Sequence, residues 1–137
     1  DPFHARYAYR YNYPLDAERM HEGAQRFVGT HDFASVRSQG TPVKSTVRTI
    51  FWCDVDKVDD LIRIRVCGDG FLYNMVRAIS GTLVYVGGGK LRPDDVADVL
   101  ASCDREQAGP TLPACGLFMN RLWYDHTGEL DRFRLGD

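Results

Sequence analysis

Residues 64–86 read "IRVCGDGFLYNMVRAISGTLVYV", and this stretch decides the fold class. The β-branched run at 64–67 predicts a strand, because such side chains pack well on a pleated surface. The "GDG" at 68–70 predicts a tight turn. From Phe71 to Val86 the apolar residues recur with the 3.6-residue period of a helix. A strand, a glycine turn and a helix also occur in phosphate-binding loops, so the stretch raises the question of a nucleotide site.

The glycine turn does not match a nucleotide-binding loop. Gly68 and Gly70 occupy the first two glycine positions of G-x-G-x-x-G, but residue 73 is a tyrosine. The missing third glycine is the one that permits close packing of helix on strand. A Lys-Ser or Lys-Thr pair does not follow either, which argues against a Walker loop. We therefore interpret residues 68–70 as a tight turn that feeds a helix.

The predicted helix has two different faces. One face is apolar and is expected to pack on the sheet; it consists of Leu72, Met75, Val76, Ile79, Leu83 and Val86. Arg77 lies nearly opposite, on the side of Tyr73, Gly81 and Val84. Gly81 would let another chain segment approach. Arg77 is either an ordinary surface arginine or an arginine that faces a cleft and binds an anion.

The flanking sequence predicts the other elements. Leu15 to Val28 is expected to form a helix that Asp16 caps and Gly29 ends. Residues 34–45 are expected to form a loop. Further patterns predict an antiparallel strand pair at 46–55 and 60–67, a short helix at 91–102 and a last strand at 116–124. This order predicts an α+β domain with a mostly antiparallel sheet flanked by helices.

Composition narrows the class of protein. A chain of 137 residues with 44% hydrophobic residues fits one globular domain. Its apolar runs are far shorter than the roughly 20 residues of a membrane span, and "DPFHARY" is not a secretory pattern. The cysteines at 53, 67, 103 and 115 lack CxxC spacing, and we interpret them as reduced thiols of a cytosolic protein.

Charge and aromatic residues leave an RNA-binding surface open. The net charge of −2 excludes a strongly basic domain, so phosphate contacts would depend on a local strip of arginines. In "RYAYRYNY", residues 6–13, arginines alternate with tyrosines. Such a run can stack on and clamp a single-stranded base. An edge strand with one aromatic face in the core explains the pattern equally well.

Metal binding is disfavoured. His31 lies beside Asp32, but the other histidines show neither HxxxH nor HxH spacing. Asp32 is expected instead to accept hydrogen bonds from backbone amides of its turn. "GGGK" at 87–90 is expected to end the long helix rather than cradle a phosphate.

Several stretches together resemble one family, the TruA-type tRNA pseudouridine synthases, and specifically their C-terminal half. The matching stretches are "FHARY", "YRY", "PLDAERMHEGAQRFVGTHDFAS", "VRTI", "GDGFLYNMVRAISGTLVYVGGGK" and "ACGLFMNRLWY". The resemblance implies one half of the pseudouridine synthase fold. It implies isomerisation of uridine to pseudouridine in the anticodon stem–loop of tRNA, on a base flipped out of its stack. It also implies a cytoplasmic homodimer that uses neither a metal nor an organic cofactor.

By the same resemblance, Arg77 pairs with a catalytic aspartate of the N-terminal half. Gly116 and Leu117 would line the uracil pocket, and Tyr9 would stack on the target base. Tyr11, the second tyrosine of that strand, and Arg6 would contact substrate. Residues 1–14 would belong to the catalytic core, and residues 15–137 would form the C-terminal α/β domain.

Two departures from the family pattern matter. The arginine-threonine-aspartate motif that carries the nucleophile is absent, so this chain alone is not expected to be catalytically complete. "FHARY" also runs directly into "AYRYNYPLD", where the family has longer connections. If these pieces are joined across gaps, residues 7–14 are not one continuous strand, and the alternation there loses its force.

Two rival functions use the same scaffold: a non-catalytic RNA-binding module, and a dimerisation or structural domain. Arg77 together with Gly116 and Leu117 favours the enzyme, since a pure binder needs no anion partner at a uracil pocket. An arginine in a mostly apolar cleft does need such a partner. In this chain alone we therefore expect a water, a buffer anion or a stray carboxylate beside Arg77.

Overall fold

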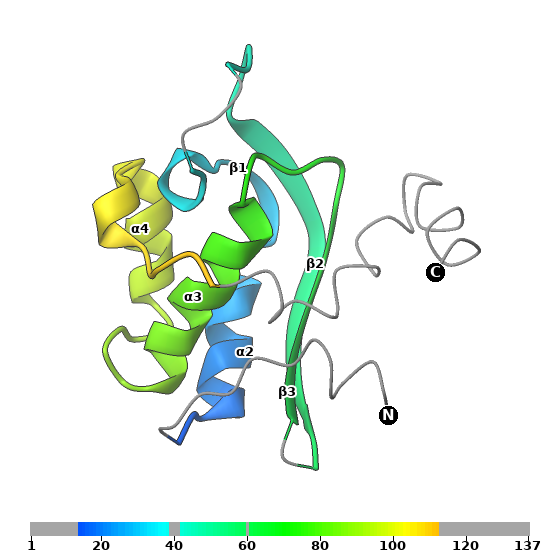
Figure 1. The fold of residues 1–137 in the computed structure, drawn as a ribbon, viewed down its shortest axis with the longest axis vertical. Helices are drawn as coiled ribbons and strands as arrows, with labels where there is room; N and C mark the ends of the chain where they lie inside the picture. Colours follow the sequence, from blue (N-terminus) through cyan, green and yellow to red (C-terminus); the bar gives the residue numbers. More distant parts are fainter. Residues whose placement is uncertain (1–13, 39–41, 60, 113–137) are drawn as a thin grey trace, which may run out of the picture.

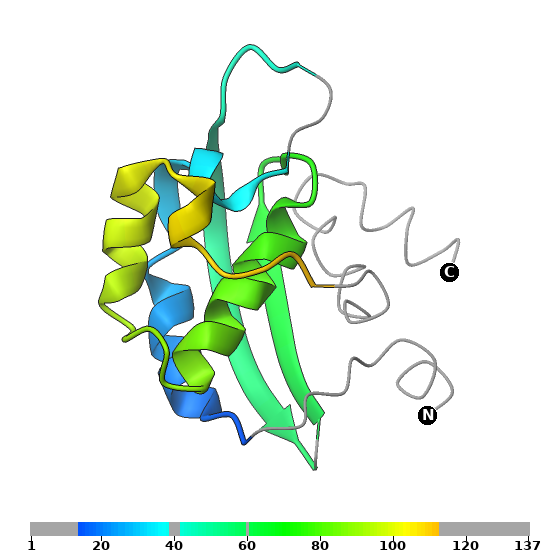
Figure 2. The same ribbon diagram turned by 60° about the vertical axis from the view of Figure 1, so that its left-hand side comes forward.

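The computed structural model describes residues 14–38, 42–59 and 61–112. Within them, strands β1 (Gly29–Asp32), β2 (Val47–Val58) and β3 (Leu61–Gly68) form one antiparallel sheet in the order β1-β2-β3. Helices α2 (Ala17–Gln25) and α3 (Met75–Gly87) lie side by side on one face of this sheet (Figures 1 and 2). Helix α4 (Asp95–Ser102) packs near β1. This arrangement confirms the predicted α+β class.

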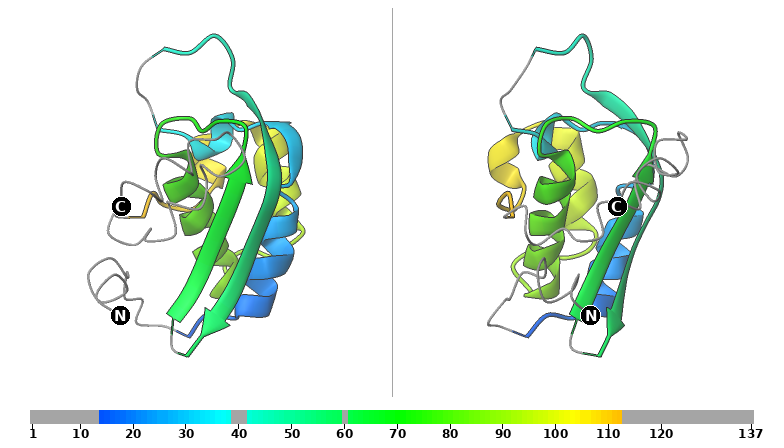
Figure 3. Two further views of the ribbon diagram at one scale, coloured as in Figure 1. Left: turned by 90° about the vertical axis from the view of Figure 1, so that its right-hand side faces the viewer. Right: turned by 45° about the vertical axis from the view of Figure 1, so that its right-hand side comes forward.

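The strand pair β2–β3 forms the long part of the sheet, and among the described residues every helix lies on one side of it (Figure 3). Asp59, with φ of 54°, begins the turn that joins Val58 to Leu61, which confirms the predicted hairpin. On the helix side the strands bury Ile50, Cys53, Val55, Ile64 and Val66. These side chains meet α2 and α3 in one apolar core.

Asp16 caps helix α2 as predicted, but the helix begins at Ala17 instead of Leu15 and ends sooner than Val28. The Asp16 carboxylate accepts hydrogen bonds from the amides of Glu18 at 3.0 Å and Arg19 at 3.1 Å. The helix ends at Gln25, and Phe27 is fully buried in the turn that follows. Gly29 has φ of 108° and starts a strand.

Strand β1 is an element that the sequence analysis did not predict. Its four residues "GTHD" carry no alternation of apolar and polar side chains, and they were expected to lie in a connection after the helix. The strand forms because β2 offers it a partner, with Gly29 opposite Ile50 and Asp32 opposite Val47. Long-range pairing therefore decides the structure here, and local propensity does not.

Helix α3 begins at Met75 and not at Phe71 as predicted. Asn74, with φ of 58°, precedes the first helical residue, and Met75 N donates to Leu72 O in a turn. The residues predicted for its apolar face are all buried, five of them within the helix and Leu72 before it. Tyr73, however, precedes the helix and is 62% exposed, so the helical period does not place it. The helix ends at Gly87, as the "GGGK" pattern predicts.

Candidate functional site

Arg77 is the predicted catalytic residue that the structure describes, and it lies half-buried in the first turn of α3. Its Nε donates to the carbonyl oxygen of Leu112 at 2.6 Å. Its Nη1 donates to the Asn74 side-chain oxygen at 2.9 Å. The Leu112 amide returns a hydrogen bond to the Arg77 carbonyl at 3.2 Å. Two uncharged oxygens thus fix the guanidinium.

A covering segment, residues 108–112, lies along α3 and brings Leu112 to Arg77. It is drawn in orange where it crosses the helix in Figures 1 and 2. The Gly109 amide donates to the Thr82 hydroxyl at 2.9 Å. A Cβ on Gly81 would lie 1.6 Å from the Pro110 carbonyl oxygen. The prediction that Gly81 lets another segment approach is therefore confirmed.

The covering segment is also held from its own side. Arg105, at the start of the short helix η2 (Arg105–Gln107), donates from Nη1 to the Gly109 carbonyl at 2.6 Å. Its Nη2 donates to the Thr111 hydroxyl at 2.9 Å. These bonds leave the segment little freedom to slide along α3.

The guanidinium of Arg77 has N–H donors that the described residues do not use. Of its five N–H groups, Nε and one on Nη1 are used by Leu112 and Asn74. Within the described residues the other three, one on Nη1 and both on Nη2, have no hydrogen-bond partner, and no carboxylate there forms an ion pair with Arg77. The carboxylate expected beside Arg77 is thus not among the described residues, and the charge of Arg77 is uncompensated by them.

Four other arginines differ from Arg77 because they are paired with aspartates: Arg26 with Asp94, Arg63 with Asp56, Arg65 with Asp54, and Arg92 with Asp95. Arg48 and Arg105 resemble Arg77, since within the described residues they too donate only to uncharged oxygens. The Arg63 guanidinium, through its hydrogen bonds, holds the pKa of Asp56 below its ordinary value. In the two pairs on β2 and β3, each aspartate lies directly opposite its arginine in the strand register. This part of the sheet is therefore close to neutral and offers little attraction to phosphate.

Comparison with known proteins identifies the scaffold. A family model described as tRNA pseudouridine synthase matches residues 24–125. The chain belongs to the tRNA pseudouridine synthase family. The resemblance inferred from the sequence is thereby confirmed.

Curated relatives of this family match most of the chain. The tRNA pseudouridine synthase A of Bacillus velezensis is 46% identical over 126 residues, which are 92% of this chain and 51% of that protein. The protein of the same name from Brevibacillus brevis is 48% identical over 124 residues, 90% of this chain and 51% of its own. That of Thermoanaerobacter pseudethanolicus is 44% identical over 118 residues, 86% and 48% respectively. The chain spans about half the length of these relatives.

The glycine turn of this family member is not a phosphate loop. The Asp69 carboxylate accepts a hydrogen bond from the Thr49 amide at 2.9 Å, and the Asp69 amide donates to the Thr49 carbonyl at 2.9 Å. A Cβ on Gly68 would lie 2.8 Å from that carbonyl oxygen. The turn thus closes the sheet against β2, and residues 71–74 separate it from the helix. Gly68 is the last residue of β3 and Asp69 lies in a bend, so the chain changes direction here but does not feed the helix directly as predicted.

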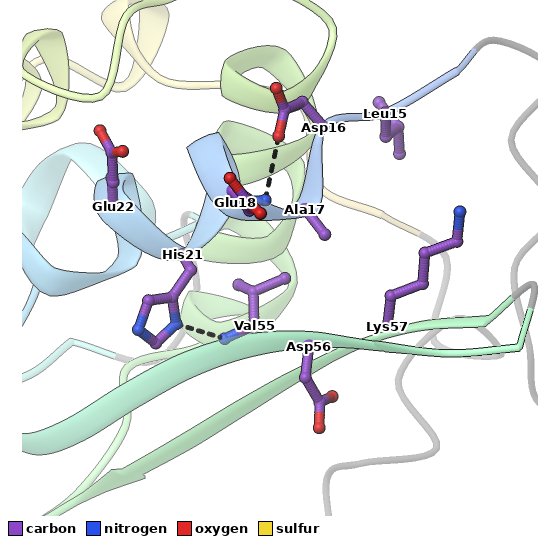
Figure 4. A pocket seen from close by; sticks show the side chains of 9 residues that line it. All are labelled: Leu15, Asp16, Ala17, Glu18, His21, Glu22, Val55, Asp56 and Lys57. Carbon is purple, nitrogen blue, oxygen red and sulfur yellow. Dashed lines mark hydrogen bonds between the residues drawn. The ribbon is translucent and has the colours of Figure 1, made fainter.

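A groove beside the start of α2 is a poor candidate for RNA (Figure 4). Its lining includes the carboxylates of Asp16, Glu18, Glu22 and Asp56 against one lysine, Lys57. His21 in this groove accepts a hydrogen bond at Nδ1 from the Val55 amide, at 3.1 Å. Acidic side chains repel a phosphate backbone, so this groove does not suit a nucleic acid.

The cysteines of the described residues are not placed as a metal site. Cys53 and Cys67 are buried, Cys103 is exposed, and Cys115 lies outside the described residues. The Asp32 carboxylate accepts from the Ala34 amide at 3.0 Å, as predicted for its turn. Across residues 14–38, 42–59 and 61–112, His, Cys, Asp and Glu side chains form no group of three suited to a metal ion.

Helices in the same ranges are too short or too polar to cross a bilayer.

The remaining predicted site residues fall outside the described residues. They are Arg6, Tyr9, Tyr11, Gly116 and Leu117, and the predicted strand at 116–124 falls there too. The sequence analysis missed the partners of Arg77, namely Asn74 and Leu112. One signal pointed to Asn74, because asparagine is enriched among residues with a left-handed backbone. The position of Leu112 had no local signal.

Proposed function

We propose that the full-length protein containing this chain isomerises uridine to pseudouridine in the anticodon stem–loop of tRNA, and that Arg77 is the part of the catalytic machinery this chain supplies. The observation that supports the proposal is the state of Arg77. Its guanidinium is oriented by two neutral oxygens, 2.6 and 2.9 Å away, and carries a charge that the described residues do not compensate. In our proposal the partner of that charge is the catalytic aspartate from another part of the protein.

Arg77 would act on this aspartate through electrostatics. A guanidinium within hydrogen-bond distance favours the ionised carboxylate and lowers its pKa. It also orients the carboxylate, because the planar guanidinium can bind two oxygens at once. The reaction breaks the bond between C1′ and N1 of the uridine and forms one between C1′ and C5, so substrate and product have the same atoms. An ionised, oriented carboxylate is the group such a rearrangement requires.

The proposal extends to the assembly and the site. The full-length protein works as a cytoplasmic homodimer, with tRNA as its partner. Tyr9 would stack on the flipped base, and Gly116 with Leu117 would line the uracil pocket. Arg6 and Tyr11 would contact the substrate. The net charge of −2 supplies no general attraction to RNA, so the contact surface would consist of local arginines other than the neutralised Arg63 and Arg65.

The rival function is an RNA-binding module on the same scaffold. A binding module would present its arginines to phosphate at the surface. Arg77 is half-buried and its charge is uncompensated by the described residues, which suits an incoming carboxylate and favours the enzyme.

The test is turnover of an unmodified tRNA transcript labelled with tritium at C5 of uracil. We compare the full-length protein with its Arg77→Lys variant, which keeps the charge and loses the planar fork. Arg92→Lys is the matched control, because the Arg92 side chain is 78% exposed and is paired with Asp95. We expect tritium release by the wild-type and the control, and loss of most release by Arg77→Lys with tRNA affinity little changed.

The outcomes separate the parts of the proposal. A wild-type protein that releases no tritium would show that the function is wrong. If Arg77→Lys lost tRNA affinity in parallel with rate in filter binding, Arg77 would be a tRNA contact and not part of the catalytic machinery.

A further inference from the structure

The inference concerns Asn74, and it rests on the proposed function of Arg77. We propose that Asn74 is a positioning residue, whose side chain and left-handed backbone set the direction of the three Arg77 N–H groups that have no partner among the described residues. Asn74 would touch neither the substrate nor the catalytic aspartate. It would act through Arg77.

The side chain of Asn74 bridges two segments. Its Oδ1 accepts from Arg77 Nη1 at 2.9 Å, and its Nδ2 donates to the Ser38 hydroxyl at 3.2 Å. This orientation of the amide is the one that chemistry permits, because a flipped amide would place its NH2 group against a guanidinium that can only donate. The Ser38 amide in turn donates to the Tyr73 carbonyl at 3.0 Å. Asn74 is therefore anchored to the segment that follows β1.

The side chain of Asn74 does not cap the helix that follows it, within the described residues. It is the residue before the first turn of α3, where an asparagine side chain normally accepts a hydrogen bond from a helix amide. Here, within the described residues, its side chain makes no such bond and takes Arg77 instead. The backbone at Asn74 is also left-handed, with φ of 58°. Such a conformation is rare outside glycine and asparagine-like residues.

The two partners of Arg77 together restrict its guanidinium. Leu112 O holds Nε, and Asn74 Oδ1 holds Nη1, so the plane of the group is defined by contacts at two different nitrogens. Both partners are uncharged and leave the positive charge available to an incoming carboxylate. Holding a reacting partner in one geometry is worth a large factor in rate, whereas loss of that geometry lowers rate more than affinity.

The experiment uses the full-length protein with Asn74→Gly. Glycine adopts the left-handed backbone without strain, so the substitution removes the two hydrogen bonds and keeps the turn. Cys103→Gly is the matched control: Cys103 also has a left-handed backbone, with φ of 52°, and also flanks a helix. We expect Asn74→Gly to lower kcat on tRNA by about tenfold to a hundredfold with KM nearly unchanged, and Cys103→Gly to leave kcat unchanged.

A second readout does not depend on activity. Restricted rotation of a guanidinium separates the NMR signals of its two Nη nitrogens. We expect separate signals for Arg77 in the wild-type protein and merged signals in Asn74→Gly. Ser38→Ala, which removes only the anchor of the Asn74 amide, should give a partial effect in both measurements.

These measurements distinguish the two proposals. If the wild-type protein shows no turnover, the proposed function fails, and the NMR signals still decide the role of Asn74. Equal kcat, or unchanged Nη signals, in Asn74→Gly and wild type would overturn the positioning role alone. A third outcome would also overturn it: Asn74→Gly lowering kcat by the same factor in the Arg77→Lys variant as in the wild type. A residue that acts through the Arg77 guanidinium should have little further effect once that guanidinium is replaced.

Discussion

Arg77 and Leu112 lie 35 residues apart and exchange two hydrogen bonds. Arg77 Nε donates to the Leu112 carbonyl at 2.6 Å, and the Leu112 amide donates to the Arg77 carbonyl at 3.2 Å. The backbone bond from the Leu112 amide holds the covering segment against the helix. The Leu112 carbonyl is thereby fixed in position and orients the Arg77 side chain. A change that lifts residues 108–112 from α3 should therefore release the guanidinium as well.

Gly81→Ala should test this coupling. The added methyl would lie 1.6 Å from the Pro110 carbonyl oxygen, and backbone atoms must shift to make room for it. We expect the free energy of unfolding to fall by about 1–3 kcal/mol or more, and the turnover of the full-length protein to fall with it. Urea unfolding and tritium release on the same sample would measure both.

Gly88→Ala is the control for Gly81→Ala. Gly88 has φ of −86°, and its Cβ would meet the Val84 carbonyl at 3.4 Å, which is nearly ordinary contact. We expect a change in the free energy of unfolding below about 1 kcal/mol. If the two variants were equally stable and equally active, the close approach at Gly81 would contribute neither to stability nor to turnover, and the proposed coupling would be wrong.

Asp32 should contribute to the stability of the fold against acid. Its carboxylate accepts a hydrogen bond from the Thr46 hydroxyl at 2.6 Å, which lowers its pKa, and the Ala34 amide lowers it further. A carboxyl whose pKa is lower in the folded state stabilises the fold above its unfolded pKa of about 3.9, and this contribution is lost as the pH falls toward the folded value. Asp32→Asn should flatten the decline of unfolding free energy below about pH 4.

Urea unfolding at several pH values would show this difference in slope. Asp98→Asn, which changes an exposed carboxylate of α4, is the control and should keep the wild-type slope. Identical slopes for wild type and Asp32→Asn would argue against the effect.

Ser35→Ala should stabilise the protein. Ser35 is fully buried in the short helix η1 (Ala34–Val36), and within the described residues its hydroxyl has no hydrogen-bond partner. A buried polar group without a partner is destabilising, so its removal should raise the free energy of unfolding by up to about 1 kcal/mol. Ser80→Ala is the contrast, since the equally buried Ser80 hydroxyl donates to the Val76 carbonyl at 2.8 Å. Removal of this hydroxyl should lower the free energy of unfolding. A loss of stability in Ser35→Ala would contradict the prediction.

Thiol reactivity should differ sharply between Cys53 and Cys103. Burial raises the pKa of the Cys53 thiol and hides it, with 1% of the residue exposed. Cys103 is exposed, although desolvation and the nearby Asp32 carboxylate raise its pKa too. Iodoacetamide at pH 8 should therefore label Cys103 faster than Cys53, as measured by peptide mass spectrometry, and Asp32→Asn should speed the reaction of Cys103. Labelling of Cys53 at the rate of Cys103 in the folded protein would speak against this account.

Local sequence patterns were sufficient wherever an element depends on its own residues. Asp16 caps α2, the five predicted apolar residues within α3 are buried, and β2 pairs with β3 as a hairpin. The close approach at Gly81 was also predictable, since a glycine on an otherwise mixed face signals a near neighbour. Each of these features reflects the burial of side chains a few residues apart, which the order of residues records directly.

Tertiary structure alone decided the rest. The polar strand β1 exists because β2 pairs with it. Helix α3 starts at Met75 because the backbone at Asn74 is left-handed, and the Asn74 side chain donates to the Ser38 hydroxyl. The family motif singled out Arg77, but its partners became visible only once residues 105–112 were seen to fold back along the helix. Hydrogen bonds between segments 35 residues apart depend on how the whole chain closes, and no local period encodes that closure.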